Sequence, residues 1–505
     1  MQWQREEHQS VWVATANMPT RPALSASIRT GVCVVGAGIS GLTTAYLLAR
    51  NGIEVTVLDD GPMGGGESRH TTAQITCVLD KGYAETEQLR GREGARQAAS
   101  SHKAAIEMIA QIVQHEQIDC DFARVDGYLF TPPGGDRSDL EDELMAAQRA
   151  GLADTTMVER LPIEHAASGP ALRFPNQAQF HILRYLEGLG QAVERLGGKI
   201  YCNTRVRRVR GGRPTYLDIE GGLNVIANAT VLATHVPMNE VIGYSSKVFA
   251  YRTYVIGMKV PQGAIPHMIA FDTLDPYHYV RLQSVDDYDV LVVGGEDHRA
   301  GQHEGAADPY AALEQWTRRT FPQAGETLFA WAGQVHNSLD GLALIGPDLV
   351  DRGVFVITGQ TGIGMTHSTL GGMIVSDIIQ GRRNPWAALY DPTRFPTGST
   401  GEVLREGLNV VKQYAGLLTG GDLISEQDIP LNSGAVIGWG ITKSAIYRDP
   451  QGAVHRFSAV CPHAGCIVGW NDGEKTWDCP CHGSRFDSYG RQIHGPSPRD
   501  LDRSE

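Results

Sequence analysis

The stretch GVCVVGAGISGLTTAYLLARNGIEVTVLDD, residues 31–60, decides the fold of most of this chain. The pattern predicts a strand at 31–35, a helix at 39–51 and a second strand at 54–59. The turn GAGISG, residues 36–41, joins the first strand to the helix. Its glycines permit a tight turn and let backbone N–H groups approach a pyrophosphate at the helix N-terminus. The stretch therefore predicts a Rossmann-like α/β fold that binds a dinucleotide.

The dinucleotide site is expected to combine this turn with an acidic residue. Asp59 ends the second strand, 23 residues after Gly36. Its carboxylate can accept hydrogen bonds from a ribose hydroxyl and would repel a 2′-phosphate. A glycine-rich turn without a ligand is the competing interpretation, but strand, helix and acid in register favour a ligand. The turn residues expected at this site are Gly36, Gly38, Ser40 and Gly41.

The composition is that of a globular protein with two or three domains. The chain has 505 residues, of which 42% are hydrophobic and 20% charged, and it is too long for one core. The net charge of −13 argues against a nucleic-acid partner, because such binding needs basic surface. The N-terminus has no recognisable secretion signal, and the apolar stretch 32–49 contains the glycine turn. We expect a cytoplasmic protein without a transmembrane segment.

Three further segments of the body have recognisable patterns. Residues 95–117 carry apolar residues at helical spacing and predict an amphipathic helix. Short aromatic and β-branched runs between 245 and 300 favour antiparallel strands, which we interpret as a substrate-facing sheet. The apolar strand 354–358 leads into a second glycine-rich turn and a helix that ends near Gly381.

The two ends of the chain differ from the body in composition. Residues 1–30 contain prolines before the first clear strand and are expected to form an extended arm. Near the other end, PTGSTGE at 396–402 predicts a linker, and 402–418 predicts a helix. A new set of short strands is expected from about residue 429.

Two segments resemble the D-amino-acid-oxidase-like (DAO) superfamily of FAD-dependent oxidoreductases. One is the opening strand-turn-helix, and the other is TGQTGIGMTHSTLGGMIVSDII at 358–379. The resemblance spans roughly residues 31–395 and implies FAD as the bound dinucleotide. It places the N-terminus of the second helix toward the flavin ring, where the positive end of the helix dipole stabilises an anionic reduced flavin. The residues it places near the isoalloxazine are Gly359, Gly362, Gly364, Met365 and Thr366.

The same resemblance implies further contacts with FAD. The loop GGGESRHTTAQIT, residues 64–76, is similar to the segment that follows the ribose carboxylate in this superfamily. It implies that Ser68, Thr71 and Thr72 reach the phosphates or the flavin, and that Val206 meets the adenine through its backbone. No second glycine-rich turn has an acidic residue at the proper distance, so a separate nicotinamide domain is not predicted.

The crowding of four of the eight cysteines between 461 and 481 indicates a metal site. The two motifs are CPHAGC at 461–466 and CPCHGS at 479–484, and they resemble the Rieske [2Fe-2S] domain. In such a domain two thiolates hold one iron and two imidazoles hold the other. The resemblance implies Cys461 and Cys479 as thiolate ligands, and His463 and His482 as imidazole ligands. Tetrahedral zinc is the competing metal, since paired Cys and His loops also suit it.

The remaining residues of the motifs resemble respiratory Rieske proteins. In those proteins the cysteines at the positions of Cys466 and Cys481 form a disulfide that joins the two cluster loops. Ser484 matches a hydroxyl that donates to a bridging sulfide, whereas Phe486 stands where a tyrosine is common, which implies a lower reduction potential. We expect His494 to be a surface loop residue, and we expect no mononuclear-iron domain of the oxygenase type.

Together the motifs predict an α/β FAD-binding body with a mixed or antiparallel substrate sheet, followed by a small all-β Rieske domain. The expected division is an arm at 1–30, an FAD-dependent oxidoreductase domain at 31–395, a linker and helix at 396–425, and the Rieske domain at 426–505. The FAD-binding parts are expected at about 31–85, 170–240 and 330–390, and the substrate part at about 86–169 and 241–329. The whole resembles bacterial FAD-dependent oxidoreductases that carry a C-terminal Rieske domain.

The predicted function follows from these two cofactors. A flavin takes a hydride or two electrons, whereas the cluster carries one electron at a time. We expect oxidation of an amine or amino-acid-like substrate at a C–N bond, with electrons leaving through the cluster to an external acceptor protein or quinone. Two alternatives remain open: the cluster feeds electrons to the flavin for a reduction or oxygen activation, or the Rieske domain is a redox sensor or docking module.

No catalytic base is recognisable, because the sequence shows no nucleophile with an adjacent base. Aromatic residues and one histidine of the strand region are candidates for the substrate pocket, although each of them could equally be an ordinary sheet or core residue. The candidates are Tyr251, Tyr254, Tyr277 and His298.

Overall fold

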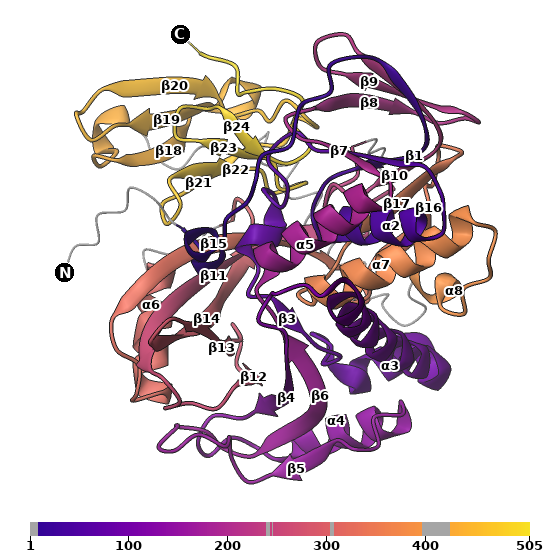
Figure 1. Cartoon of the computed structure of the whole chain (residues 1–505). Coiled ribbons are helices and arrows are strands. Elements are labelled where there is room, and N and C mark those ends of the chain that lie inside the picture. The colour runs from indigo at the N-terminus through magenta and orange to yellow at the C-terminus, as the bar shows by residue number, and fades with distance from the viewer. Residues whose placement is uncertain (1–8, 239–242, 245, 303–307, 396–424, 505) are drawn as a thin grey trace.

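Two large β-sheets form the body of the chain, and two small ones form its C-terminal domain, in a computed structural model (Figure 1). The structure describes residues 9–238, 243, 244, 246–302, 308–395 and 425–504. The predicted linker at 396–402 and the helix at 402–418 lie outside the described residues. The α/β body and the all-β C-terminal domain agree with the predicted fold class.

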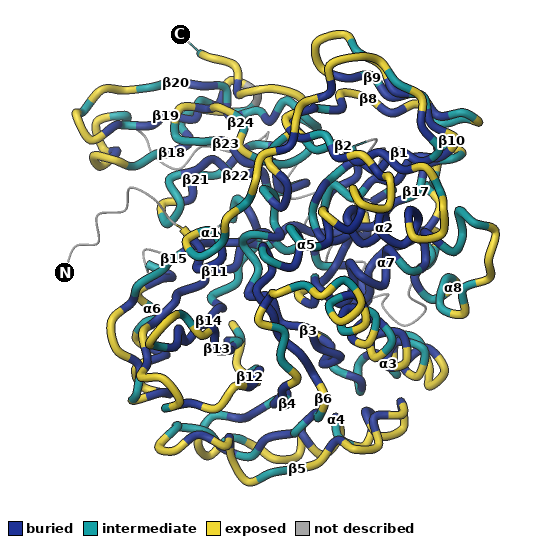
Figure 2. The backbone as a smooth tube through the Cα atoms, viewed as in Figure 1, coloured by how far each residue is buried: buried dark blue, intermediate teal, exposed yellow. Residues whose placement is uncertain are grey.

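The eight-stranded sheet has a parallel centre in the order β16-β17-β10-β1-β2-β7. Its strands are continuous apolar runs because helices cover them, and Figure 2 shows β1 and β2 buried beside the buried helices α2 and α7. β16 and the β8–β9 hairpin add antiparallel pairs. The strands are β1 (Ile28–Val35), β2 (Val55–Leu58), β7 (Lys199–Tyr201), β8 (Val206–Arg210), β9 (Thr215–Ile219), β10 (Asn224–Leu232), β16 (Leu344–Pro347) and β17 (Val354–Thr358).

The helices of the body include the two that the glycine-rich turns predicted. The first turn opens α2 and the second opens α7, and these two helices pack against each other. The predicted helix at 95–117 is the second half of a longer α3, which bends at Gly91, where φ is +71°. The prediction missed the first half because its apolar residues are sparse. The helices are α2 (Ile39–Arg50), α3 (Gly82–Glu116), α4 (Ser138–Arg149), α5 (Ile182–Arg195), α6 (Pro309–Thr320), α7 (Gly364–Ile379), α8 (Ala387–Tyr390) and the 3₁₀ helix η1 (Glu67–His70).

The nine-stranded sheet has the order β15-β11-β14-β13-β12-β4-β6-β3, with β5 paired to β6. The antiparallel strands predicted between 245 and 300 are β11 to β14, and β12 pairs with β4 in parallel, so the sheet is mixed. β6 belongs to this sheet, although the predicted division put 170–179 with the FAD-binding part. The strands are β3 (Gln74–Ile75), β4 (Ala123–Phe130), β5 (Thr156–Val158), β6 (Ala171–Gln179), β11 (Val248–Pro261), β12 (Met268–Asp272), β13 (Tyr279–Val285), β14 (Tyr288–Arg299) and β15 (Thr327–Ser338).

The N-terminal arm is more than an extended segment. It contains a short helix, α1 (Val11–Thr15), which Ser10 caps by accepting a hydrogen bond from the backbone N–H of Val13 at 3.4 Å. Trp12 is completely buried, and its indole Nε1 donates to the carbonyl of Thr71 at 2.6 Å. The arm therefore packs against the loop that the sequence assigned to FAD binding.

The C-terminal domain consists of a three-stranded and a four-stranded antiparallel sheet. Its core contains Trp477, Phe486 and three of the motif cysteines. In the described part of the chain, no helix has the length and apolar character needed to cross a membrane. The elements are η3 (Glu426–Asp428), β18 (Ser433–Ile437), η4 (Gly440–Thr442), β19 (Ser444–Arg448), β20 (Val454–Ser458), β21 (Gly469–Asn471), β22 (Thr476–Asp478), β23 (Arg485–Asp487) and β24 (Gln492–His494).

Candidate flavin and iron-sulfur site

The first glycine-rich turn is held in shape by Asp59. Its carboxylate accepts the backbone N–H of Ala37 at 2.6 Å and that of Gly61 at 2.9 Å. Gly36 has a φ of +108°, and a Cβ there would overlap the carbonyl oxygen of Ala233. Burial raises the pKa of Asp59 to about 7. The acid therefore organises the turn and stands at the end of β2, where a ribose hydroxyl can reach its remaining lone pairs.

The loop of residues 64–76 closes over this turn. Ser68 Oγ accepts the N–H of Ile39, the first residue of α2, at 3.1 Å. Farther along, Thr76 and Thr366 hydrogen-bond reciprocally at 3.2 and 2.9 Å, which ties the loop to α7. The helix of the arm supports the loop from outside, because Ser10 Oγ donates to the carbonyl of Arg69 at 2.7 Å. No motif in the sequence predicts this supporting role of the arm.

The N-terminus of α7 is open toward the interior. Ile363 caps this helix of 16 residues, and no side chain caps the first backbone N–H groups. Gly364 and Met365 line a cavity there, and nothing lies within 4 Å of a Cβ built on Gly364. Uncapped N–H groups and a helix dipole that face a cavity suit the anionic edge of a reduced flavin.

One continuous cavity of about 920 Å³ connects these segments. Its lining fits an extended dinucleotide, because glycine turns, an acid and a helix N-terminus follow one another along it. Of the fourteen predicted FAD contacts, eleven line it: Gly36, Gly38, Ser40, Asp59, Ser68, Thr71, Thr72, Val206, Gly362, Gly364 and Met365.

The other three predicted contacts support the cavity without lining it. Gly41 packs under the first turn, where a Cβ would overlap the carbonyl oxygen of Gly36. Gly359 has a φ of +65°, and a Cβ there would lie 3.3 Å from Val248. Thr366 is used by the hydrogen bonds to Thr76. These residues shape the backbone around the cavity instead of facing it.

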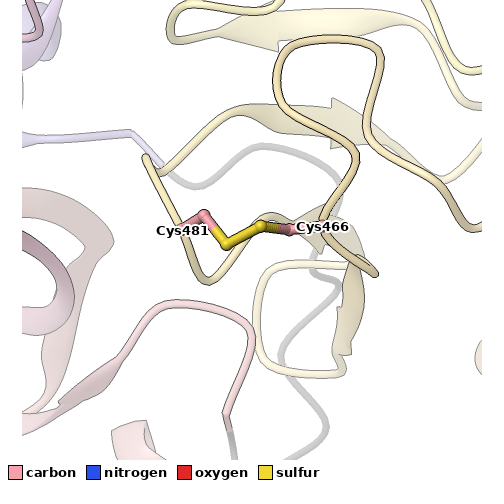
Figure 3. Close-up of a disulfide and its surroundings, with 2 residues drawn as sticks. All are labelled: Cys466 and Cys481. Carbon is pink, nitrogen blue, oxygen red and sulfur yellow. A yellow bond between two sulfur atoms is a disulfide. The ribbon is translucent and has the colours of Figure 1, made fainter. Parts of the chain in front are cut away.

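The cluster motifs fold into two loops with the same backbone geometry. In the first, the N–H of Gly465 donates to the carbonyl of Cys461, and in the second, Gly483 donates to Cys479, both at 3.0 Å. Both glycines have a positive φ, +79° and +70°. The disulfide between Cys466 and Cys481 joins the loops, with a Cα–Cα distance of 6.4 Å (Figure 3).

The four predicted ligands meet in two pairs. Cys461 and Cys479 are buried and share a hydrogen bond, which lowers the pKa of Cys461 and raises that of Cys479. The rings of His463 and His482 lie 4.7 Å apart between centroids. Burial lowers the pKa of His482 to about 4, which keeps the imidazole neutral as ligation requires. Two thiols and two imidazoles fit a [2Fe-2S] cluster with two protein ligands on each iron.

The same arrangement disfavours zinc. Tetrahedral zinc needs four side chains that converge on one ion. Within the described ranges, no group of three or more His, Cys, Asp or Glu side chains is placed to hold a metal ion together. Ser484 is fully buried and hydrogen-bonds to Cys461, as the predicted donor to the cluster should.

The C-terminal domain contributes directly to the flavin cavity. His463 lines it, and so does the segment from Gln492 to Pro498. His494 is half-buried there, with Nε2 lying 3.6 Å from Glu67 Oε1, so the expectation of a surface loop residue was wrong. Two more cavity-lining histidines lie close together, with the rings of His235 and His336 4.2 Å apart. Only the tertiary contact between the domains reveals this group.

Three of the four substrate-pocket candidates lie elsewhere. Tyr277 lines the cavity, whereas Tyr251, Tyr254 and His298 do not. Tyr254 is fully buried, and its hydroxyl hydrogen-bonds to His298 at 2.9 Å and to Asn471 of the C-terminal domain at 3.2 Å. Tyr251 receives a hydrogen bond from Arg299 at 3.3 Å. The sequence could not separate them, because all come from the same strand region.

Charged residues join the two domains around these aromatics. Arg252 is completely buried and lies 3.6 Å from Glu474 and 4.0 Å from Asp478. At a second point, Arg205 of the segment before β8 donates to Gln492 at 2.7 Å. Because removing one partner from a buried ion pair costs free energy, these contacts favour one fixed position of the C-terminal domain.

Comparison with known proteins matches both parts of the chain. The family description "FAD dependent oxidoreductase" matches residues 31–378, and "Rieske [2Fe-2S] domain" matches residues 422–504. The putative Rieske 2Fe-2S iron-sulfur protein YhfW of Bacillus subtilis (strain 168) is 29% identical over 98% of this chain and 97% of its own length. Gamma-glutamylputrescine oxidoreductase of Escherichia coli (strain K12) is 24% identical over 77% of this chain and 93% of its own.

A solved structure shows the same fold in the body. Glycine oxidase from Geobacillus kaustophilus superimposes with a TM-score of 0.61 and 20% identity, over 73% of this chain and 99% of that chain. The superposition covers nearly the whole glycine oxidase chain but only about three quarters of this one.

Proposed function

The chain belongs to the family of FAD-dependent oxidoreductases and carries a C-terminal Rieske domain, and from this premise we propose that it oxidises an amine or amino-acid-like substrate and passes the electrons through the Rieske domain to an external acceptor. Bound FAD supplies two-electron chemistry, and the Rieske [2Fe-2S] cluster carries single electrons. The proposed bond is C–N, because glycine oxidase and gamma-glutamylputrescine oxidoreductase are among the similar proteins.

One observation carries the proposal. His463, an imidazole ligand of the cluster, lines the same cavity as Gly364 and Met365 of the flavin-facing helix. No separate carrier is then needed between the two sites. The acceptor in this proposal is a protein or a quinone that meets the C-terminal domain from outside.

The residues around the junction have supporting roles in this proposal. Glu67 Oε2 accepts the backbone N–H of Gln334 at 2.7 Å, which fixes the edge of β15 next to the cavity. Burial lowers the pKa of His235 to about 4 and keeps its imidazole neutral. The His235 imidazole therefore adds no positive charge beside Glu67.

Anaerobic mixing tests the direction of electron flow. The holoprotein is mixed with a panel of amines and amino acids while the flavin and cluster absorption bands are followed separately. Loss of the flavin band followed by slower loss of the cluster band is expected. A flavin that reacts with no substrate, beside a cluster that dithionite reduces, would contradict the proposal and favour the reverse current or a sensing role.

A matched variant isolates the second step. Cys461→Ser removes one predicted cluster ligand and leaves the disulfide pair Cys466 and Cys481 unchanged. We expect it to keep FAD and its reduction by substrate but to lose transfer to a one-electron acceptor such as ferricyanide at limiting concentration. If transfer to the acceptor persists unchanged without the cluster, the electrons do not leave through the Rieske domain.

A further inference from the structure

The part of the cavity beside the nine-stranded sheet contains one acidic side chain and two tyrosines. Asp80 lies just before α3, and a Cβ built on Gly362 would overlap its carboxylate. The rings of Tyr277 and Tyr279 also line the cavity, with centroids 5.7 Å apart. Tyr279 lies flat over Gly294, where a Cβ would overlap the ring. An acid and two aromatic faces thus meet beside the flavin-facing loop.

A second acid stands behind the tyrosines. The hydroxyl groups of Thr253 and Tyr277 lower the pKa of Asp297 of β14, against the effect of its burial. Thr253 Oγ1 and the hydroxyl of Tyr279 are 2.6 Å apart, and either group can donate this hydrogen bond. Asp297 therefore lies close enough to both tyrosines to raise their pKa values, and within the described part of the chain its buried Oδ1 has no hydrogen-bond partner.

The charged neighbour that affects Asp80 in this corner is a second acid, Asp297. Asp80 is exposed to the cavity, and desolvation by the protein around it together with the neighbouring Asp297 raises the pKa of Asp80 to about 7. Burial likewise raises the pKa of Asp297 to about 7, although His278 opposes this. His278 itself is engaged by Asp272 at 2.8 Å and by Glu296 at 3.5 Å. Ionising two neighbouring, desolvated carboxyl groups costs free energy. A bound cation would offset this cost.

The arginines of the cavity belong to other segments. Among the described lining residues, Arg69 comes from η1, and Arg205 and Arg207 flank the predicted adenine contact. The last two already donate to Gln492 and Pro498 of the C-terminal domain. A substrate carboxylate, which is recognised best by a guanidinium, would meet Asp80 instead and be repelled.

We infer that this corner binds the ammonium group of a cationic amine, with Asp80 as its counter-charge and Tyr277 and Tyr279 as aromatic walls. The substrate class is then amines without a carboxylate beside the reacting nitrogen, not α-amino acids. This inference rests on the proposed function in one respect, namely that the cavity is the site where the substrate binds.

Binding measurements on the holoprotein test the inference with three probes of similar size. Butylamine carries only the ammonium, butanoate only the carboxylate, and 2-aminobutanoate both. In anaerobic calorimetric titration, the Kd of butylamine should be at least tenfold lower than that of 2-aminobutanoate. Butanoate should show no binding. Tighter binding of 2-aminobutanoate than of butylamine would overturn the inference.

Two variants and one control assign the effect to the corner. Asp80→Asn should weaken butylamine binding at least tenfold, whereas Asp287→Asn, an exposed acid between β13 and β14, should change it less than twofold. If Asp80→Asn is isolated without FAD, Tyr277→Leu replaces it in the test. Tyr277→Leu should weaken the binding of butylamine and leave the FAD content unchanged. Unchanged butylamine affinity in the corner variant is the result that contradicts the role of Asp80.

The two proposals can fail separately. Reduction of the flavin by α-amino acids and not by amines would leave the proposed function standing and overturn the amine corner. Tight binding of butylamine without flavin reduction by any amine or amino acid would leave the corner standing and overturn the proposed oxidation.

Discussion

Gly483 of the second cluster loop packs directly against the side chain of Gln334 on β15. A Cβ on Gly483 would overlap the amide nitrogen of Gln334, and Gln334 lines the flavin cavity. The amide of Gln334 is buried, and among the residues that the structure describes neither of its polar atoms has a hydrogen-bond partner. One side chain therefore touches both the cluster loop and the cavity. The residue that follows the predicted cluster ligand His482 is thus in contact with the wall of the cavity.

Gly483→Ala should disturb this contact and slow electron transfer from flavin to cluster. The methyl group meets Gln334, which costs about 1–3 kcal/mol by overpacking, in addition to about 1 kcal/mol for an alanine at positive φ. Gly465→Ala is the matched control, because its φ is also positive but nothing lies within 4 Å of the added Cβ. Stopped-flow rates of cluster reduction should fall in the first variant only. Equal rates in both would show that the contact does not position the domains.

The disulfide should stabilise the cluster loops without being needed to bind iron. Cys466 and Cys481 are 15 residues apart, and closing a loop of that length contributes about 3 kcal/mol. Replacing both by serine should lower the thermal midpoint of the C-terminal domain by about 10 °C, while the cluster signal in electron paramagnetic resonance is retained at low temperature. Cys461→Ser, by contrast, should abolish that signal. Loss of the cluster from the double serine variant in the folded protein would show that the bond is required for assembly.

Asp59→Ala should weaken FAD binding by about 100-fold. The change leaves the N–H groups of Ala37 and Gly61 without their acceptor, and each such buried group costs about 1–3 kcal/mol. Asp218→Ala is a suitable control, since Asp218 pairs with Arg210 on the exposed β8–β9 hairpin. Fluorescence titration of the apoprotein with FAD measures the FAD affinity of both variants. Affinity that is unchanged in Asp59→Ala would contradict the assignment of this acid to the dinucleotide site.

Amine binding should weaken as the pH falls through about 7. The pKa of Asp80 is raised to about 7, so the carboxylate is charged above this pH and is lost as a counter-charge below it. The other titratable groups around it are Asp297, Tyr277 and Tyr279, with His278 and Glu296 behind Asp297. The Kd of butylamine should rise by up to about tenfold per pH unit below 7, as one titrating group requires. In Asp80→Asn this dependence should be strongly reduced, and a Kd that instead falls toward low pH would exclude the carboxylate as the counter-charge.

The sequence alone determined those features whose residues lie within a few positions of each other. The turn at 36–41 and the two cluster loops are shaped by local backbone geometry, so their motifs sufficed to predict Cys461 and His482 as members of one site, and their role as ligands stays a prediction. Alternating and continuous apolar patterns likewise determined the α/β body and the all-β C-terminal domain, because burial of one face sets the period of each element.

Only the tertiary structure decided which residues surround the cavity. Asp80 and Asp297 are brought together from the start of α3 and the end of β14, and His494 reaches the flavin site from the other domain. Tyr254 is a tyrosine of the aromatic strand region, as a pocket residue could be, yet its hydroxyl hydrogen-bonds to Asn471 across the domain interface. These contacts depend on how two sheets and a separate domain pack in space, which no spacing along the chain records.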